Sequence, residues 1–135
     1  MYKRLAHVGI AVKNLDQSSV VFSKLFGLAP GHTEEVPEQK VKAVFFSTGE
    51  SGIELLEPTS PESPIGKFLA KRGEGVHHLS LEVDEIETEM ARLVAEGFQL
   101  VDQKPRMGAE GYRVAFLHPK STNGVLIELS EKKKG

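Results

Sequence analysis

Two histidines stand at matching places in two similar segments of the sequence. His7 opens the segment His7–Val12, and His78 opens the segment His78–Val83, 71 residues further on (78 − 7). In both segments apolar residues recur at every second position after the histidine, which is the period of a β-strand. Each imidazole should therefore point away from the apolar face. A lone strand histidine is more often a structural residue than a ligand, but a duplicated one indicates a shared site.

Two glutamates repeat as well, each at the centre of an Ile-Glu-Leu triplet. They are Glu54 and Glu128. Because both neighbours of each glutamate are apolar, the carboxylates should point to the face opposite the apolar one. If the two halves of the chain pair about a pseudo-twofold axis, each contributes one imidazole and one carboxylate to a common centre. The predicted metal ligands are His7, Glu54, His78 and Glu128.

Two nitrogen and two oxygen ligands suit a borderline divalent ion such as cobalt, manganese, nickel, zinc or iron. They leave one or two positions of an octahedron open, where a substrate can bind. The chain has no cysteine, so it forms neither a thiolate metal site nor a disulfide. Three further histidines have no repeated counterpart. His32 and His118 are expected to be structural, and His77 is expected either to support the neighbouring ligand or to be structural.

The elements that must position these side chains begin with an amphipathic helix after the first histidine segment. Asn14 or Asp16 is a suitable N-cap, and Gly27 is a suitable stop. The predicted buried stripe consists of Leu15, Ser18, Ser19, Phe22, Leu25 and Phe26. Such a stripe should cover the apolar face of the preceding strand.

A helix of the same design is predicted after the second histidine segment. Asp84 and Glu87 have the spacing of a capping box, and Gly97 ends the helical pattern. The predicted buried stripe consists of Ile86, Met90, Leu93 and Val94.

Further strand-like segments follow each helix. They are Val41–Ser47 and Gly52–Glu57 in the first half, and Leu100–Lys104, Arg113–Leu117 and Gly124–Leu129 in the second. A short linker helix is predicted by Ser63 as N-cap, Pro64 at the first helical position and Gly73 beyond the end.

This order of elements predicts an α+β fold of two paired βαβββ modules, which form a curved, cupped mixed sheet with the helices on the outside. The 135 residues fit a single domain. Module one is expected at about 4–60, the linker helix at about 63–73 and module two at about 75–131.

Composition excludes several classes of function. The formal net charge is −2 and the pI is near 6.2, so the overall field does not favour nucleic acid or an anionic membrane. No segment approaches the roughly 20 apolar residues of a membrane span, and the N-terminus lacks the apolar run of a signal peptide. We therefore expect a cytoplasmic protein with neither nucleic-acid nor membrane partners.

Six motifs occur together over nearly the whole chain: His7–Val12, Glu54–Pro58, Ser63–Ile65, His77–Leu79, Phe116–Lys120 and Gly124–Leu129. In this combination the chain resembles the vicinal-oxygen-chelate superfamily and, within it, the methylmalonyl-CoA epimerase family. The resemblance implies an isomerase that interconverts the (R) and (S) forms of methylmalonyl-CoA, a coenzyme A thioester. It also implies a homodimer and a divalent metal ion, cobalt first among the candidates, on ligands that match the four residues above.

Two positions depart from the family pattern. Some bacterial relatives have glutamine as the second ligand, where this chain has Glu54. A strand glutamate proposed as an acid or base in some relatives falls near Ala43 here, so that role cannot be carried over.

Epimerisation requires a proton to leave the carbon α to the thioester and another to return on the opposite face. A divalent metal would stabilise the enolate as its negative charge develops. Glu128 is the first candidate acid/base, since a carboxylate beside the metal can reach the substrate. Glu54 is a weaker candidate, and a metal-bound water or a residue of the loop Glu34–Glu38 could be the second carrier.

Three other functions are compatible with the same pattern. A glyoxalase-type isomerase or lyase on a glutathione adduct uses a similar ligand set. An extradiol dioxygenase needs two histidines and one carboxylate, and the fourth ligand counts against it. A metal-free small-molecule binding module has no need of both histidines and both glutamates.

Overall fold

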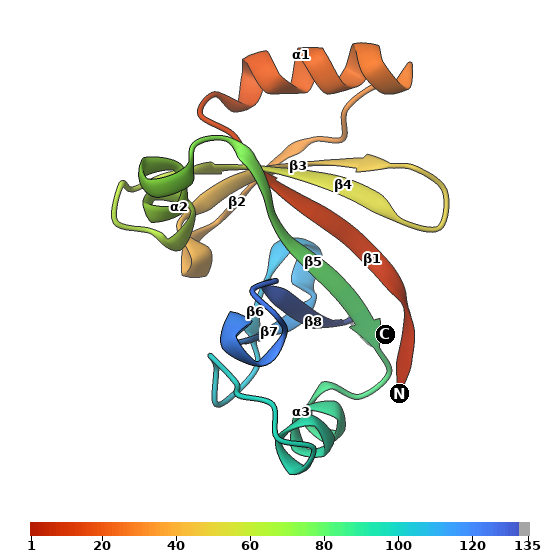
Figure 1. Cartoon of the computed structure of the whole chain (residues 1–135). Coiled ribbons are helices and arrows are strands. Elements are labelled where there is room, and N and C mark those ends of the chain that lie inside the picture. Colours follow the sequence, from red (N-terminus) through yellow and green to blue (C-terminus); the bar gives the residue numbers. More distant parts are fainter. Residues whose placement is uncertain (133–135) are drawn as a thin grey trace. The chain divides into compact units, whose positions relative to one another are not determined.

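The computed structural model describes residues 1–132, which fall into two compact units (Figure 1). Unit 1 contains Met1–His7 and the chain from His78 onward, and unit 2 contains Val8–His77. Along the chain, one strand, one helix and three strands occur twice, which confirms the predicted α+β class and the two βαβββ modules. The order of strands in the mixed sheet is β2-β3-β4-β1-β5-β8-β7-β6.

Unit 2 contains the strands of the first module. They are β2 (Thr33–Val36), β3 (Val41–Ser47), β4 (Gly52–Pro58) and the second half of β1 (Tyr2–Ala11). β3 is antiparallel to β2 and β4, and β4 is parallel to β1. One face of these strands packs against α1 (Leu15–Phe26), and the buried core between them consists of Val12, Leu15, Val44, Phe46 and Leu55.

The predicted ends of α1 are confirmed. Asn14 is the N-cap, and its side-chain oxygen accepts a hydrogen bond from the Gln17 N–H at 2.9 Å. Gly27 ends the helix with φ of 67°, a left-handed conformation that costs glycine little. The prediction for Leu25 was wrong, because its side chain is 69% exposed. Leu25 lies about 80° around the helix axis from Leu15, outside the stripe that meets the sheet.

The linker helix α2 (Pro64–Arg72) also follows its sequence signals. The Ser63 hydroxyl accepts a hydrogen bond from the Gly66 N–H at 3.1 Å, and Gly73 follows the last turn. Gly66 is required by close packing, because a Cβ atom there would lie 2.5 Å from the Pro61 carbonyl oxygen.

Unit 1 contains the strands of the second module and the first half of β1. They are β5 (Gly75–Val83), which enters the unit at His78, β6 (Arg106–Met107), β7 (Arg113–Leu117) and β8 (Ile127–Glu131). β5 is parallel to β8, and β7 is antiparallel to both β8 and β6. One face packs against α3 (Ile86–Ala95), with a core of Val83, Ile86, Met90, Leu93, Ala115, Leu117 and Leu129.

The predicted capping box at the start of α3 was wrong. Glu85 is the N-cap residue of this helix, and its side chain makes no capping hydrogen bond. Instead the Glu131 carboxylate, from β8, accepts a hydrogen bond from the Ile86 N–H at 3.0 Å. Asp84 pairs with Lys3 at 3.7 Å rather than capping. The helix is therefore capped by a residue distant in sequence.

Val94 was also wrongly assigned to the buried stripe of α3, since it is 52% exposed. Like Leu25, it lies about 80° around the helix axis from the first buried residue of its helix. On the other side of the stripe, Glu89 is only 4% exposed and pairs with Arg92 and the N-terminal amine.

Two predicted strands of the second module were misplaced. The segment Leu100–Lys104 makes only an isolated bridge, between Leu100 and Leu117, and the edge strand is β6 instead. Asp102 accounts for the lost strand, because its carboxylate accepts a hydrogen bond from the Phe116 N–H at 2.8 Å. A neighbouring strand would otherwise supply that acceptor from its backbone. The last strand begins at Ile127 rather than Gly124, which has a left-handed φ of 85°.

The polar strand β2 was not predicted, since Thr33–Val36 has no apolar alternation. Within residues 1–132, we find no helix with the length and apolar character needed to cross a membrane.

Candidate metal centre

The glutamates occupy the same register in both modules. Gly9 of β1 is paired with Glu54 of β4, and Ser80 of β5 is paired with Glu128 of β8. Gly9 and Ser80 each follow the histidine of their strand by two residues. Because side chains alternate across a strand, each glutamate shares the face on which the histidine of its neighbouring strand projects. The opposite faces are those that pack against α1 and α3.

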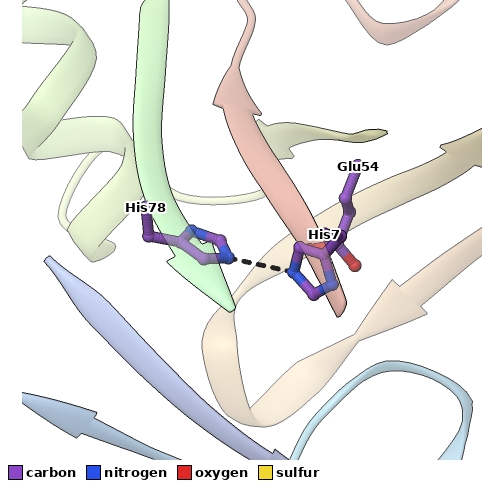
Figure 2. A group of neighbouring side chains, drawn as sticks. All are labelled: His7, Glu54 and His78. Carbon is purple, nitrogen blue, oxygen red and sulfur yellow. Dashed lines mark hydrogen bonds between the residues drawn. The ribbon is translucent and has the colours of Figure 1, made fainter. Parts of the chain in front are cut away.

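Three of the four predicted ligands meet within unit 1. The Nε2 atoms of His7 and His78 are 3.1 Å apart (Figure 2). The Glu128 Oε1 atom lies 3.5 Å from His7 Nε2 and 3.9 Å from His78 Nε2. The side chains are 14%, 4% and 5% exposed for His7, His78 and Glu128, respectively. The structure therefore brings two imidazoles and one carboxylate to one sheltered point.

The distance between the two imidazole nitrogens fits a common metal ion. Two nitrogens at about 2.1 Å from one cation, at right angles, lie about 3.0 Å apart. The observed 3.1 Å between Nε2 atoms is close to that value. Neutral imidazole nitrogens and a carboxylate are also the donors that borderline divalent ions prefer. The donor set in unit 1 therefore fits a divalent metal.

Glu54 is the predicted ligand that belongs to unit 2. Its side chain is buried, with 7% exposure, in the centre of β4. His7, Glu54 and His78 form a group of side chains that could hold a metal ion (Figure 2).

Two phenylalanines extend the repeat and were missed by sequence reasoning. Phe116 is paired with Glu128 across β7 and β8, and Phe45 is paired with Glu54 across β3 and β4. The Phe116 ring meets the His78 ring edge to face, with centroids 5.8 Å apart. Phe45 and Phe116 are separated by 71 residues, the same spacing as the two histidines, and that coincidence could have revealed them. An apolar ring beside the ligands restricts water.

Neighbouring polar side chains line the same face of β5 beyond His78. The Ser80 hydroxyl contacts the Ser130 hydroxyl at 3.2 Å. Further along, the Arg4 guanidinium donates to Glu82 at 3.1 Å, and both sit beside Tyr112, whose pKa is raised mainly by burial. At this end of the face, the polar side chains of Ser80 and Glu82 therefore contact other side chains of unit 1.

Two of the remaining histidines have structural roles, as expected. The ring of His77 packs edge to face on Phe68, with centroids 5.0 Å apart, and burial lowers the pKa of His77 to about 4. The Nδ1 atom of His118 accepts a hydrogen bond from the Lys120 N–H at 3.1 Å, which caps a short 3₁₀ turn.

Comparison with known proteins places these features in a family. Residues 6–116 match the family model described as the glyoxalase/bleomycin resistance protein/dioxygenase superfamily. The chain is 43% identical to the mitochondrial methylmalonyl-CoA epimerase of Dictyostelium discoideum, over 96% of this chain and 78% of that protein. It is 37% identical to the ethylmalonyl-CoA/methylmalonyl-CoA epimerase of Cereibacter sphaeroides, over 97% of this chain and 99% of that protein.

A solved structure agrees with both relatives. A variant of the Streptomyces coelicolor methylmalonyl-CoA epimerase, in complex with 2-nitronate-propionyl-CoA, superimposes with a TM-score of 0.93. It is 36% identical, and the match covers 99% of this chain and 100% of that one. By fold and by sequence, the chain belongs to the methylmalonyl-CoA epimerase family of the glyoxalase/bleomycin resistance protein/dioxygenase superfamily.

Proposed function

We propose that this protein interconverts the (R) and (S) forms of methylmalonyl-CoA. It is an enzyme of the isomerase class, as its family membership requires. The single observation that carries the proposal further is the meeting of His7, His78 and Glu128 at one buried point, on the face opposite the one that packs against α3. A proton-transfer reaction on an acidic carbon needs such a sheltered and polar centre.

We propose that four residues hold the metal ion: His7, Glu54, His78 and Glu128. The equal registers of Glu54 and Glu128 support this set. Each carboxylate projects to the same face as the histidine of the parallel strand with which it is paired. With two carboxylates and two neutral imidazoles, the site would carry a charge of about zero once a dication is bound. When bound, the dication supplies a Lewis acid for the negative charge that develops on the substrate oxygens. Cobalt is our first candidate, and manganese, nickel, zinc and iron suit the same donors.

Glu128 is the first of the chain's own groups that we assign to proton transfer. Its Oε1 atom is the oxygen that faces both imidazoles, so Oε2 is the oxygen assigned to the substrate proton. The backbone of Glu128 is fixed by parallel pairing with Ser80 and antiparallel pairing with Phe116. A carboxylate held on two sides can keep its position while it gains and loses a proton. Glu54 has the equivalent place in the first module and is the weaker candidate.

Burial of the centre supports the same chemistry. The side chains of His78 and Glu128 are nearly inaccessible, and Phe116 stands against the His78 ring. A site that excludes water strengthens every charge interaction within it, which favours loss of a proton from carbon.

The test is an assay of epimerisation with cobalt added to the purified chain. Proton NMR in D₂O follows exchange of the α-proton, while a coupled assay specific for one stereoisomer follows epimerisation. With methylmalonyl-CoA as the substrate, we expect both exchange of the α-proton and epimerisation. Turnover of a glutathione hemithioacetal instead would assign the chain to the glyoxalase type. Failure to bind any divalent metal would support the metal-free binding module.

A further inference from the structure

We infer that Glu131 is a positioning residue of the proposed metal site, because its carboxylate fixes the register in which β8 carries Glu128 past His78. The inference rests on the proposed function, since the metal site is part of that proposal. It concerns unit 1, to which His78, Glu128 and Glu131 all belong. Glu131 acts through the strand that it shares with Glu128, and not by contact with the metal.

The Glu131 carboxylate joins β8 to two other elements of unit 1. Its Oε2 atom accepts a hydrogen bond from the N–H of Ile86, the first residue of α3, at 3.0 Å. Its Oε1 atom accepts a hydrogen bond from the Arg113 guanidinium of β7 at 2.8 Å. Glu131 is only 3% exposed, so water does not readily replace these two donors. The two oxygens therefore hold β8 against α3 and β7 at one buried position.

Glu131 and Glu128 project to opposite faces of the same strand. Glu131 follows Glu128 by three residues, and side chains alternate along a strand. When the Glu131 carboxylate meets the start of α3, the Glu128 carboxylate must therefore project to the face of the histidines. A hydrogen bond made on the helix side of the sheet thus determines where the carboxylate on the other side lies.

The backbone ladder between β5 and β8 is short, so one more connection matters to its register. The ladder runs over four residue pairs and ends where Glu82 is opposite Ser130. Glu131 follows directly after this last pair, and only two residues connect the end of β5 to Ile86. The hydrogen bond from Ile86 to Glu131 therefore extends the connection between the two strands by one further position.

A shift of β8 along β5 would take Glu128 away from His78, which now lies 3.9 Å from it. A slip by one residue turns every side chain of β8 to the other face and puts Glu128 against α3. A slip by two residues keeps the face but moves the carboxylate about 7 Å along the strand. Either slip also leaves the Ile86 N–H and the buried Glu131 carboxylate without each other, which is unfavourable. Glu131 therefore opposes both displacements.

The first module repeats the arrangement at the matching place. Glu57 accepts a hydrogen bond at 2.7 Å from the N–H of Leu15, the first residue of α1. Glu57 follows Glu54 by three residues, as Glu131 follows Glu128, and it comes directly after the last residue pair of the β1–β4 ladder. α1 is also capped by a side chain of its own, so Glu57 adds a connection to the ligand strand rather than the only cap. The recurrence of this bond at a fixed distance from each proposed ligand supports a positioning role.

The test compares Glu131→Ala with Glu131→Gln in cobalt binding. Isothermal titration of the metal-free proteins, at a temperature where all variants are folded, gives the affinity, and the visible absorption of bound cobalt reports its ligand geometry. Alanine removes both acceptor oxygens, so we expect cobalt affinity to fall by at least about 10-fold, the scale for losing a group that orients a ligand. The cobalt spectrum should change with it, because the Glu128 carboxylate is displaced. Glutamine keeps an oxygen that can accept the Ile86 N–H, so its affinity and spectrum should stay close to those of the wild type.

Leu93→Ala is the matched control for loss of stability. It removes a buried side chain of α3 from the core of unit 1 and leaves both hydrogen bonds of Glu131 in place. We expect Leu93→Ala to lower the Tm, as Glu131→Ala does, but to bind cobalt with the affinity and the spectrum of the wild type. A lowered Tm alone therefore does not account for a change in the metal site.

Wild-type cobalt affinity and spectrum in Glu131→Ala would overturn the inference, since Glu131 would then contribute to stability alone. If Glu131→Ala does not fold, Glu131→Leu decides by the same criteria, because leucine fills the buried space and has no acceptor. A wild-type chain that binds no cobalt would refute the proposed metal site and this inference with it. Cobalt-bound wild-type enzyme that fails to epimerise methylmalonyl-CoA would refute the proposed reaction, whereas the comparison of cobalt binding would still decide the role of Glu131.

Discussion

The Nε2 atoms of His7 and His78 face each other at 3.1 Å, from two strands whose histidines are 71 residues apart in sequence. Two neutral imidazoles can share one proton at this distance, or one metal ion can take the place of that proton. The nearby Glu128 carboxylate, 3.5 Å from His7, favours a cation at this point.

Replacing one of these imidazoles should weaken metal binding strongly. We expect His78→Ala to lower cobalt affinity by at least about 100-fold, because losing even a partner that only orients a ligand costs 10–100-fold. Isothermal titration of metal-free protein measures this directly. His32→Ala, an exposed histidine outside the site, is the control and should bind cobalt like the wild type. Equal affinity in the two variants would remove His78 from the ligand set.

Removal of the metal should abolish epimerisation. A chelator such as EDTA is expected to reduce the rate to background, because the site offers no other strong electrophile for the developing charge. Added cobalt, and to a lesser extent manganese or nickel, should restore the rate in proportion to bound metal. Full turnover by protein shown to be metal-free would contradict the proposed mechanism.

Substitution of Glu128 by glutamine separates its two proposed roles. Glutamine keeps an oxygen that can bind metal but cannot take up a proton near neutral pH. We expect the rate to remain depressed by about 10²-fold or more at saturating cobalt. Near-normal epimerisation by the metal-saturated variant would leave Glu128 as a ligand alone.

The stability of unit 1 should depend on pH through Glu89. Its pKa is lowered, first by the hydrogen bond from Arg92 and also by the N-terminal amine. The ionised form is therefore the stabilised one, so its contribution is present above the ordinary pKa of 4.5 and is lost as pH falls below it. We expect Glu89→Gln to cost about 1 kcal/mol at pH 7, since both partners reach solvent. The difference in Tm between variant and wild type should shrink at pH 3.5.

Local signals in the sequence predicted the elements that depend on local physics. The ends of α1 at Asn14 and Gly27 and the start of α2 at Ser63 and Pro64 follow from capping chemistry alone. The strand Val41–Ser47 follows from its run of β-branched and aromatic residues. The meeting of His7, His78 and Glu128 was predictable because duplication makes a weak signal visible twice.

The errors fall where a distant residue decides the local structure. Glu131 caps α3 from another strand, and Asp102 replaces the expected strand pairing at Phe116. Leu25 and Val94 are apolar, but each lies about 80° around its helix from the first buried residue, outside the stripe that meets the sheet. The homodimer, the native metal and the cytoplasmic location stay predictions.

The equal registers of β1 with β4 and of β5 with β8 have a consequence for redesign of this chain. In each module the glutamate is reached through a hairpin, with residues 48–51 between β3 and β4 and residues 118–126 between β7 and β8. These connections differ in length, yet both glutamates keep the same offset from their histidines. Loop length is therefore uncoupled from the positions of the ligands. Residues 118–126 can therefore change in length without displacing Glu128, whereas one residue inserted between Gly52 and Glu54 would turn that carboxylate toward α1.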